Sequence, residues 1–312
     1  MKTETNRTAR PRSAFTLLEL VIVIAIIGML SSLLFFGIGG ALRGVDVTRV
    51  KAEFTQLESA ITQFESNYGV TPPSAIVLTE NPGATAWDPV SKSVLRRMFG
   101  NSVDFTTLVD FNGDGDTTDV LTLTSSEGLL FFLGGMRDAS SFPLTLQTAA
   151  ITGFSANREK PFARGGDNRI DPQFAFDLTR LIDNDGDGMP EYRDLATEES
   201  VAMAFASSNN GQGYSDSNGS VIYFHQADGS TAWNENSFQL ISPGADGQFG
   251  FGDPDSAEPA LFETWSWSSA SGPTTTSTLN GAPWNRTEIQ VRTQLLLQQD
   301  NISNFAPGTM GQ

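Results

Sequence analysis

The feature that most constrains the fold is an uncharged run near the N-terminus, from Leu20 to Leu42. As a helix rising about 1.5 Å per residue, this run is long enough to cross a hydrocarbon core of roughly 30 Å. Residues 1–14 hold one acid and four basic residues: Glu4, Lys2, Arg7, Arg10 and Arg12. By the positive-inside rule we expect a cytoplasmic N-terminus, with the rest of the chain outside the membrane. A secretory signal peptide is the alternative, but its apolar region would be shorter and would end in a small-residue cleavage site.

Glu19 stands at the edge of this run. A lone carboxylate at the centre of a membrane helix costs about 2.5 to 3.5 kcal/mol, and a nearby cation recovers much of that cost. The position of Glu19 allows two interpretations. The segment is a plain membrane anchor with Glu19 among the lipid headgroups, or Glu19 has a positively charged partner.

The residues Phe15-Thr16-Leu17-Leu18-Glu19, followed by the apolar run to Gly28, resemble the class III signal of type IV prepilins and type II secretion pseudopilins. The resemblance implies that a prepilin peptidase cuts between Ala14 and Phe15 and that the new amine is methylated. It also implies that Glu19 pairs with the amine of a neighbouring subunit. Ala14 departs from the glycine usual before the cut, although it keeps the small size.

The same resemblance implies a place for the protein in the cell. The expected partners are other pilin or pseudopilin subunits, the peptidase and an inner-membrane assembly platform. The chain would first cross the inner (cytoplasmic) membrane once. It would then join a periplasmic or cell-surface filament.

Beyond Arg43, apolar residues recur at alternating spacings of three and four: Val47, Val50, Phe54, Leu57, Ile61, Phe64 and Tyr68. This spacing predicts one face of a helix, with polar residues such as Glu53 on the other sides. Gly69 and Pro72-Pro73 end the pattern. In the resembling family this helix packs on a globular head. A free coiled-coil stalk is the alternative.

Residues 70–312 are rich in Gly, Ser, Thr, Asn and Asp, which favours an antiparallel sheet with long loops. The predicted fold class is therefore α+β, a long N-terminal helix packed on a β-rich head. Its segments are a leader at 1–14, an assembly helix at 15–42, an amphipathic helix at 43–69 and a head at 70–312. Within the head a capping box at Thr124–Glu127 predicts a helix through Leu133.

Three segments of the head read as strands: Val221–Phe224, Phe238–Ile241 and Ile289–Leu297, the last of which also suits a helix. The low-complexity segment Ser266–Gly281 predicts an exposed loop.

The charge balance excludes several classes of function. The chain has 36 acidic and 19 basic residues and a net charge of −17, so binding of nucleic acid through a broad basic face is not expected. Cysteine is absent and His225 is the single histidine, which removes disulfides, thiolate nucleophiles and Cys/His zinc sites. We expect no enzyme, because His225 lacks the pattern of a catalytic triad.

One acidic segment has the spacing of a calcium loop. From Asp183 to Asp194, acids occupy positions 1, 3, 5, 9 and 12, and glycine occupies position 6. The segment resembles thrombospondin type 3 and other EF-hand-like loops, which implies a carbonyl ligand at Met189 and these side-chain ligands: Asp183, Asp185, Asp187, Glu191 and Asp194. An acidic surface turn without a cation is the alternative.

Two further segments predict weaker calcium sites, so that the chain would bind one to three ions. The first resembles a dockerin loop, and its candidate ligands are Asp110, Asn112, Asp114, Asp116 and, at position 10, Asp119. Its position 12 is Leu121, so the closing acid is missing. The second resembles the C-terminal calcium loop of major pseudopilins, with candidate ligands Asp246, Asp253 and Asp255.

These features together favour a pseudopilin. Many type IV pilins close their C-terminal region with a disulfide, whereas major pseudopilins use calcium, and this chain has acidic loops and no cysteine. A type IV pilus subunit is one alternative. A membrane-anchored adhesin or lectin, with Trp265, Trp267 and Trp284 stacking on sugars, is another.

Overall fold

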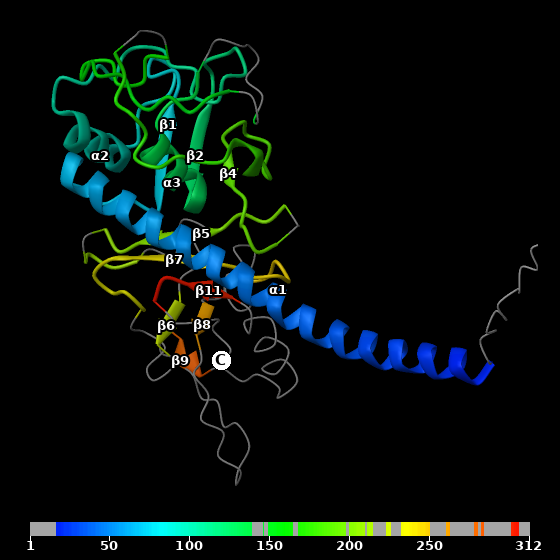
Figure 1. Cartoon of the computed structure of the whole chain (residues 1–312). Coiled ribbons are helices and arrows are strands. Elements are labelled where there is room, and N and C mark those ends of the chain that lie inside the picture. The colour runs from blue at the N-terminus through cyan, green and yellow to red at the C-terminus, as the bar shows by residue number, and fades with distance from the viewer. Residues whose placement is uncertain are drawn as a thin grey trace, which may run out of the picture. The chain divides into compact units, whose positions relative to one another are not determined.

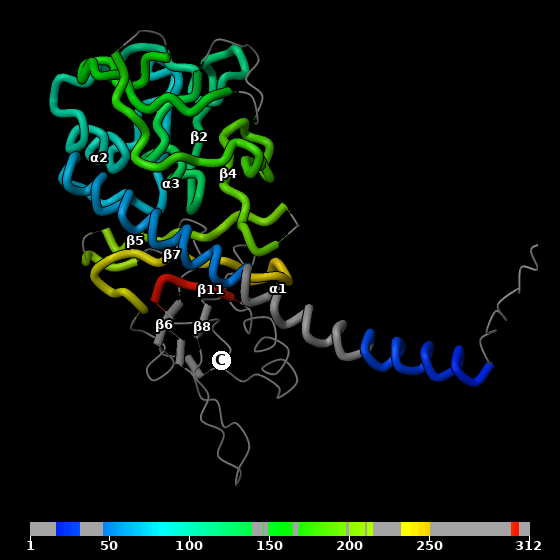
Figure 2. The backbone as a smooth tube through the Cα atoms, viewed as in Figure 1, coloured from blue at the N-terminus to red at the C-terminus, as the bar shows by residue number. Residues whose placement is uncertain are grey.

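In a computed structural model of the chain, the structure describes residues 17–138, 146, 149–164, 168–197, 200–209, 211–214, 223–225, 232–249, 260–262, 278–279, 282–283 and 301–305 (Figure 2). At 32–45, 223–225, 260–262, 278–279 and 282–283 it describes the backbone alone. The chain divides into two compact units, Met1–Asp46 and Val47–Gln312. Predictions for residues 1–16, for most of Ser266–Gly281 and for Ile289–Leu297 fall outside the described residues.

The first unit holds the start of helix α1, which runs from Leu17 to Tyr68 as one element. Apolar side chains are exposed along its first turns, among them Leu17, Leu20 and Ile24. Among the residues that the structure describes, we find no helix with both the length and the apolar character needed to cross a membrane. The predicted span extends into residues 32–45, whose side chains are not described, so it stays a prediction.

In the second unit, the predicted apolar face of α1 is buried in the main hydrophobic core. Its fully or nearly fully buried residues are Val50, Phe54, Leu57, Ile61 and Phe64, and Val47 and Tyr68 pack at the edge. The helix ends as predicted, because Gly69 adopts a φ of +68° and its N–H returns to the Glu65 carbonyl at 2.8 Å. The free-stalk alternative is therefore wrong.

One part of the head packs on α1 through aromatic rings. Strands β1 (Ala75–Thr79) and β2 (Val120–Thr124) pair antiparallel, and helix α3 (Ser125–Gly134) follows β2 directly. The Phe64 ring of α1 lies 5.9 Å from that of Phe132 in α3. The end of α1 lies beside helix α2 (Pro89–Phe99), where Tyr68 and Phe99 are 5.8 Å apart (Figure 1).

The predicted α3 helix is confirmed, with its capping box. Glu127 accepts a hydrogen bond from the Thr124 N–H at 3.1 Å, which satisfies a donor at the start of the helix. Helix α2, which the sequence analysis did not predict, has a similar device: Asp88 accepts the Ser91 N–H at 2.7 Å.

A second sheet has the order β11-β7-β5, formed by β5 (Ala204–Ser207), β7 (Phe238–Ser242) and β11 (Ile302–Ser303). It contacts the same helix, since Lys51 of α1 donates to the Ser303 carbonyl and Asn304 donates to Glu58 at 3.1 Å. The predicted strand at Phe238–Ile241 is confirmed as β7.

The remaining strands are short. Strand β6 (Tyr223–His225) overlaps the predicted strand at Val221–Phe224 and pairs parallel with β8 (Ala260–Phe262), although the head was expected to be antiparallel. Strands β9 (Thr278–Leu279) and β10 (Ala282–Pro283) pair antiparallel, so β9 falls within the segment predicted as a loop.

The hairpin that carries the main acidic loop is tied to α1. A 3-10 turn, η1 (Leu178–Arg180), leads into β3 (Leu181–Ile182), which pairs with β4 (Glu191–Tyr192). The Arg180 guanidinium makes two bonds to the Glu53 carboxylate of α1, at 2.5 and 3.1 Å, and both side chains are largely buried. Glu53 was assigned to the polar side of the helix, and the structure shows that this side also contacts the head.

Candidate functional site

The predicted calcium loop is the turn of the β3–β4 hairpin. Asp183, directly after β3, accepts the N–H groups of Gly186 at 2.7 Å and Gly188 at 3.2 Å. Asp185 accepts the Asp187 N–H at 3.3 Å, and Asp187 accepts the Met189 N–H at 2.8 Å. Gly188, at position 6, has the positive φ of +84° that the sharp turn requires.

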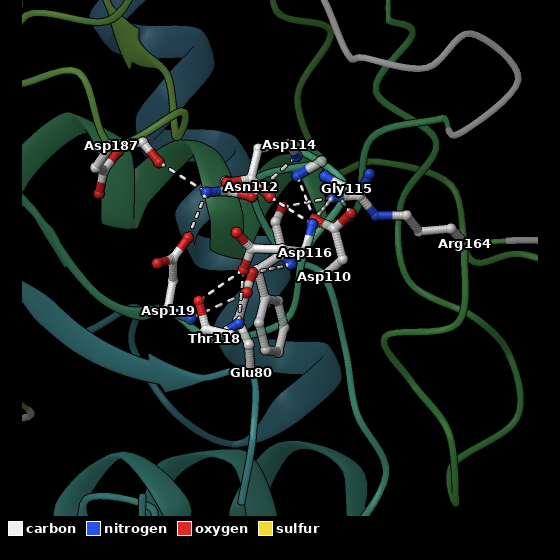
Figure 3. Close-up of polar contacts among 12 residues, drawn as sticks. Glu80, Asp110, Asn112, Asp114, Gly115, Asp116, Thr118, Asp119, Arg164 and Asp187 are labelled. Atoms are coloured by element: carbon white, nitrogen blue, oxygen red, sulfur yellow. Dashed lines mark hydrogen bonds and ion pairs between the residues drawn. The ribbon is translucent and has the colours of Figure 1, made fainter. Parts of the chain in front are cut away.

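The second acidic loop repeats this scheme between α2 and β2. Its first residue, Asp110, accepts from Gly113 and Gly115, the residues at positions 4 and 6 (Figure 3). Asn112 accepts the Asp114 N–H at 3.1 Å, and Asp114 accepts the Asp116 N–H at 2.9 Å. The two loops therefore share bonds from positions 4 and 6 to position 1, from 5 to 3 and from 7 to 5.

The amide of Asn112 joins the two loops. Its Nδ2 donates to Asp119 Oδ2 at 3.1 Å within its own loop and to the Asp187 carbonyl of the other loop at 3.0 Å (Figure 3). Packing at this point is close, because a side chain at Gly188 would meet the Asn112 Cβ at 3.0 Å. The structure thus brings together two acidic segments that lie far apart in sequence.

Each loop also meets a buried glutamate from a neighbouring element. Oxygens of Glu127, Asp185 and Asp187 lie within 4.8 Å of one another. So do oxygens of Glu80, Asp116 and Asp119.

Sequence reasoning identified neither glutamate as a site residue. Glu127 was noted for its capping-box position alone. Glu80 follows β1 without any motif, so no local pattern pointed to it.

Glu80 is fully buried and both of its oxygens accept backbone hydrogen bonds. Oε1 accepts the Phe111 N–H at 2.6 Å and Oε2 accepts the Asp119 N–H at 3.3 Å. Burial raises the pKa of Glu80, and these two bonds partly oppose the rise. Arg164 lies on the other side of this loop, 3.9 Å from Asp110.

The hairpin site is strongly negative. Burial, together with the negative charges of Asp187, Asp185 and Glu191, raises the pKa of Glu127 to about 8. Burial also raises the pKa of Asp187 to about 6. Glu191 accepts the Asn184 N–H at 3.0 Å across the loop, and burial raises its pKa. A cation would favour the charged form of every one of these groups.

Two predicted ligands of the hairpin loop, Asp194 and Met189, have side chains that are buried in contacts outside the acidic turn. Asp194 is buried with an exposed fraction of 2 %, accepts the Ala196 N–H at 2.7 Å and is hydrogen-bonded to Ser242. Burial raises the pKa of Asp194 to about 6, although Arg180 opposes the rise. Met189, the predicted carbonyl ligand, buries its side chain in the main core.

The third predicted loop is described only in part. Asp246 follows β7 and accepts the Gln248 N–H at 2.9 Å within a turn. Asp253 and Asp255 lie outside the described residues.

At the base of the hairpin, a buried polar network joins the acidic loop to α1. Arg180 lies over the Tyr192 ring, 4.1 Å from its centre, and the Tyr192 hydroxyl contacts the Glu53 carboxylate at 3.2 Å. Arg180 also donates to the Arg193 carbonyl at 2.6 Å. Arg180, before the acidic turn, and Tyr192, after it, therefore both contact Glu53 of α1.

The predicted processing and assembly residues lie at the start of the chain. Ala14 and Phe15 fall outside the described residues, whereas Glu19 lies in the first turn of α1 with an exposed side chain.

Comparison with known proteins identifies this segment. Residues 9–35 match the family model of the prokaryotic N-terminal methylation motif, which covers Ala14, Phe15 and Glu19. The motif is the class III prepilin signal of type IV pilins and pseudopilins, so the resemblance is confirmed. No curated protein and no solved structure matches the chain.

Proposed function

We propose that this protein is a pilin-like structural subunit of a type II secretion-type pseudopilus. The observation that carries the proposal is the methylation motif at residues 9–35. It supports processing by a prepilin peptidase and assembly with other pilin subunits. The chain would cross the inner membrane once and then enter a periplasmic or cell-surface filament.

Glu19 would hold neighbouring subunits in register. Cleavage before Phe15 creates an amine at the start of the mature helix, a few residues from Glu19. In an apolar surrounding this amine and the carboxylate of a neighbouring subunit attract each other far more strongly than in water. The exposed position of Glu19 on α1 leaves it accessible to such a neighbour.

A pseudopilus is favoured over a surface pilus because the head has acidic segments for bound calcium and no cysteine for a disulfide. The chain has no cysteine, and acidic segments pack together in its head. We infer that calcium occupies one to three of these segments, as in the loop that stabilises major pseudopilins. A non-enzymatic role follows from the same proposal.

The test of the subunit role is processing in cells with and without an active prepilin peptidase. We expect intact mass and N-terminal peptides to show a chain that begins at a methylated Phe15 only where the peptidase is active. An Ala14→Gly variant, which restores the residue usual before the cut, serves as a positive control. A chain that keeps Met1 to Ala14 in peptidase-positive cells would refute the proposal.

A further inference from the structure

Three acidic side chains from two separate elements meet at the β3–β4 hairpin. Glu127 comes from the first turn of α3, whereas Asp185 and Asp187 come from the hairpin turn. We propose that these three residues bind one calcium ion and that Glu127, in place of Asp194, is the carboxylate that closes the site. The inference rests on the calcium binding proposed for the head and gives that binding a specific ligand set.

The first argument is an unpaired oxygen inside the protein. Glu127 has an exposed fraction of 4 %, and its Oε2 is used by the capping bond from Thr124. Its Oε1 is buried and has no hydrogen-bond partner among the described residues. A buried acceptor without a partner is costly, and more so when it is charged. A cation beside Oε1 would remove this cost.

The second argument is the spacing of the oxygens. Calcium binds oxygen at about 2.3 to 2.6 Å, so ligands on opposite sides of the ion are about 4.6 to 5.2 Å apart. One carboxylate oxygen from each of Glu127, Asp185 and Asp187 lies within 4.8 Å of the other two, which fits a single shared ion. Magnesium demands near-ideal octahedral geometry and keeps several waters, which a buried glutamate at the site opposes.

The third argument is charge. Among the residues that the structure describes, the ion pairs are Arg164 with Asp110 and Arg180 with Glu53, so none of the three ligands is paired. The charges that act on Glu127 are those of Asp187, Asp185 and Glu191, all negative. Carboxylate oxygens without nitrogen or sulfur donors select a hard divalent cation.

The fourth argument explains why position 12 of the loop does not close the site. Asp194 accepts a hydrogen bond from Ala196, bonds to Ser242 and is attracted by Arg180 at the base of the hairpin. Its carboxylate is therefore satisfied in a different network. Glu127 supplies from α3 the closing carboxylate that an EF-hand-like loop takes from its own last position.

The test is calcium titration of the purified full chain in detergent by calorimetry, with wild type, Glu127→Gln and Asp194→Asn. Glutamine keeps the capping bond of α3, so this variant removes the charge and keeps the helix start. We expect Glu127→Gln to bind one calcium ion fewer, or to bind it about tenfold or more weakly, because ligand charge tunes calcium affinity. Asp194→Asn should keep the wild-type stoichiometry and affinity.

A second variant, Asp187→Asn, guards against misfolding of Glu127→Gln, because Asp187 lies in the turn outside every helix and strand. It should lose the same ion, and the double variant Glu127→Gln/Asp187→Asn should lose no more than either single variant.

If wild type takes up calcium and Glu127→Gln takes up as much with equal affinity, the assignment of Glu127 is wrong while calcium binding by the head stands. If wild type takes up none, both proposals fail. If Asp194→Asn loses the ion instead, the usual closing residue is the correct one.

Discussion

At the scale of single residues, Glu127 combines two tasks in one carboxylate. One oxygen accepts the capping bond of α3, and the carboxylate also lies close to those of Asp185 and Asp187. The capping role could be predicted, because it depends on residues three positions apart in sequence. The contact with the hairpin could not, because it depends on how α3 packs against a segment some sixty residues later.

The acidic site predicts an unusual pH dependence for the calcium-free protein. Burial raises the pKa of Glu127 to about 8 and that of Asp187 to about 6, so the folded chain holds protons that the unfolded chain releases. The free energy of unfolding contributed by these groups is therefore fully present below about pH 4, their pKa in the unfolded chain, and is lost as pH rises towards 8. Thermal unfolding of calcium-free protein at pH 5, 6.5 and 8 measures this. Glu127→Gln should flatten the dependence, and a wild-type midpoint that rises across this range would contradict the argument.

A second residue-scale prediction concerns Glu19. Glu19→Ala should insert into the membrane and fold like wild type, yet enter filaments poorly, because the amine of the neighbouring subunit loses its partner. Leaving one member of a buried pair uncompensated costs about 3 to 5 kcal/mol. Cross-linking of filaments measures incorporation. Glu58→Ala, in the part of the same helix that packs on the head, is the control. Normal assembly of Glu19→Ala would exclude the pairing role.

At the scale of elements, the long helical pattern of α1 was predicted correctly, whereas strand pairings and side-chain bonds between distant segments were not. The face of α1 from Val50 to Phe64 follows from helical spacing, because every residue on it meets one core. Strands β1 and β2 were missed, since their pairing of Ile76 with Leu123 spans a long insertion with no local mark. The bond between Asp194 and Ser242 could not be predicted for the same reason, because Ser242 lies in another strand.

The link between the hairpin and α1 predicts strong coupling between Glu53 and Arg180. Arg180→Met leaves the Glu53 charge buried without its partner, which should cost about 3 to 5 kcal/mol of the free energy of unfolding. The double variant Glu53→Gln/Arg180→Met should recover much of this loss, because no charge remains and glutamine can still accept from Tyr192. Chemical denaturation of all four proteins gives the coupling energy. Strictly additive losses would show that the pair does not act as a unit.

At the scale of the whole molecule, 36 acidic residues against 19 basic ones give a chain whose charges repel one another. Bound cations would offset this repulsion. Composition does not indicate where they would bind, since the meeting of two loops through Asn112 arises only in the folded chain.

Calcium should therefore stabilise the full chain against heat. At 100 times its dissociation constant, an ion bound to one site adds about 2.7 kcal/mol to the folded state. For a unit of this size each kcal/mol raises the melting temperature by about 2 to 4 °C. Thermal unfolding with calcium and with chelator tests this. Asp183→Ala/Asp187→Ala should lose most of the effect. Glu65→Gln, at an exposed acid of α1 outside every acidic loop, is the control and should keep the effect. An unchanged melting temperature on chelation of wild type would count against bound calcium.

The single amide of Asn112 has a further consequence for how the two loops respond to their surroundings. Because this side chain donates to Asp119 in one loop and to the Asp187 carbonyl in the other, ordering either loop fixes a donor that the other one uses. The conformational entropy lost when the first loop becomes rigid need not be lost again by the second. If calcium binds in both loops as proposed, we expect them to act as one cooperative unit, in which an ion bound in either loop raises the affinity of the other.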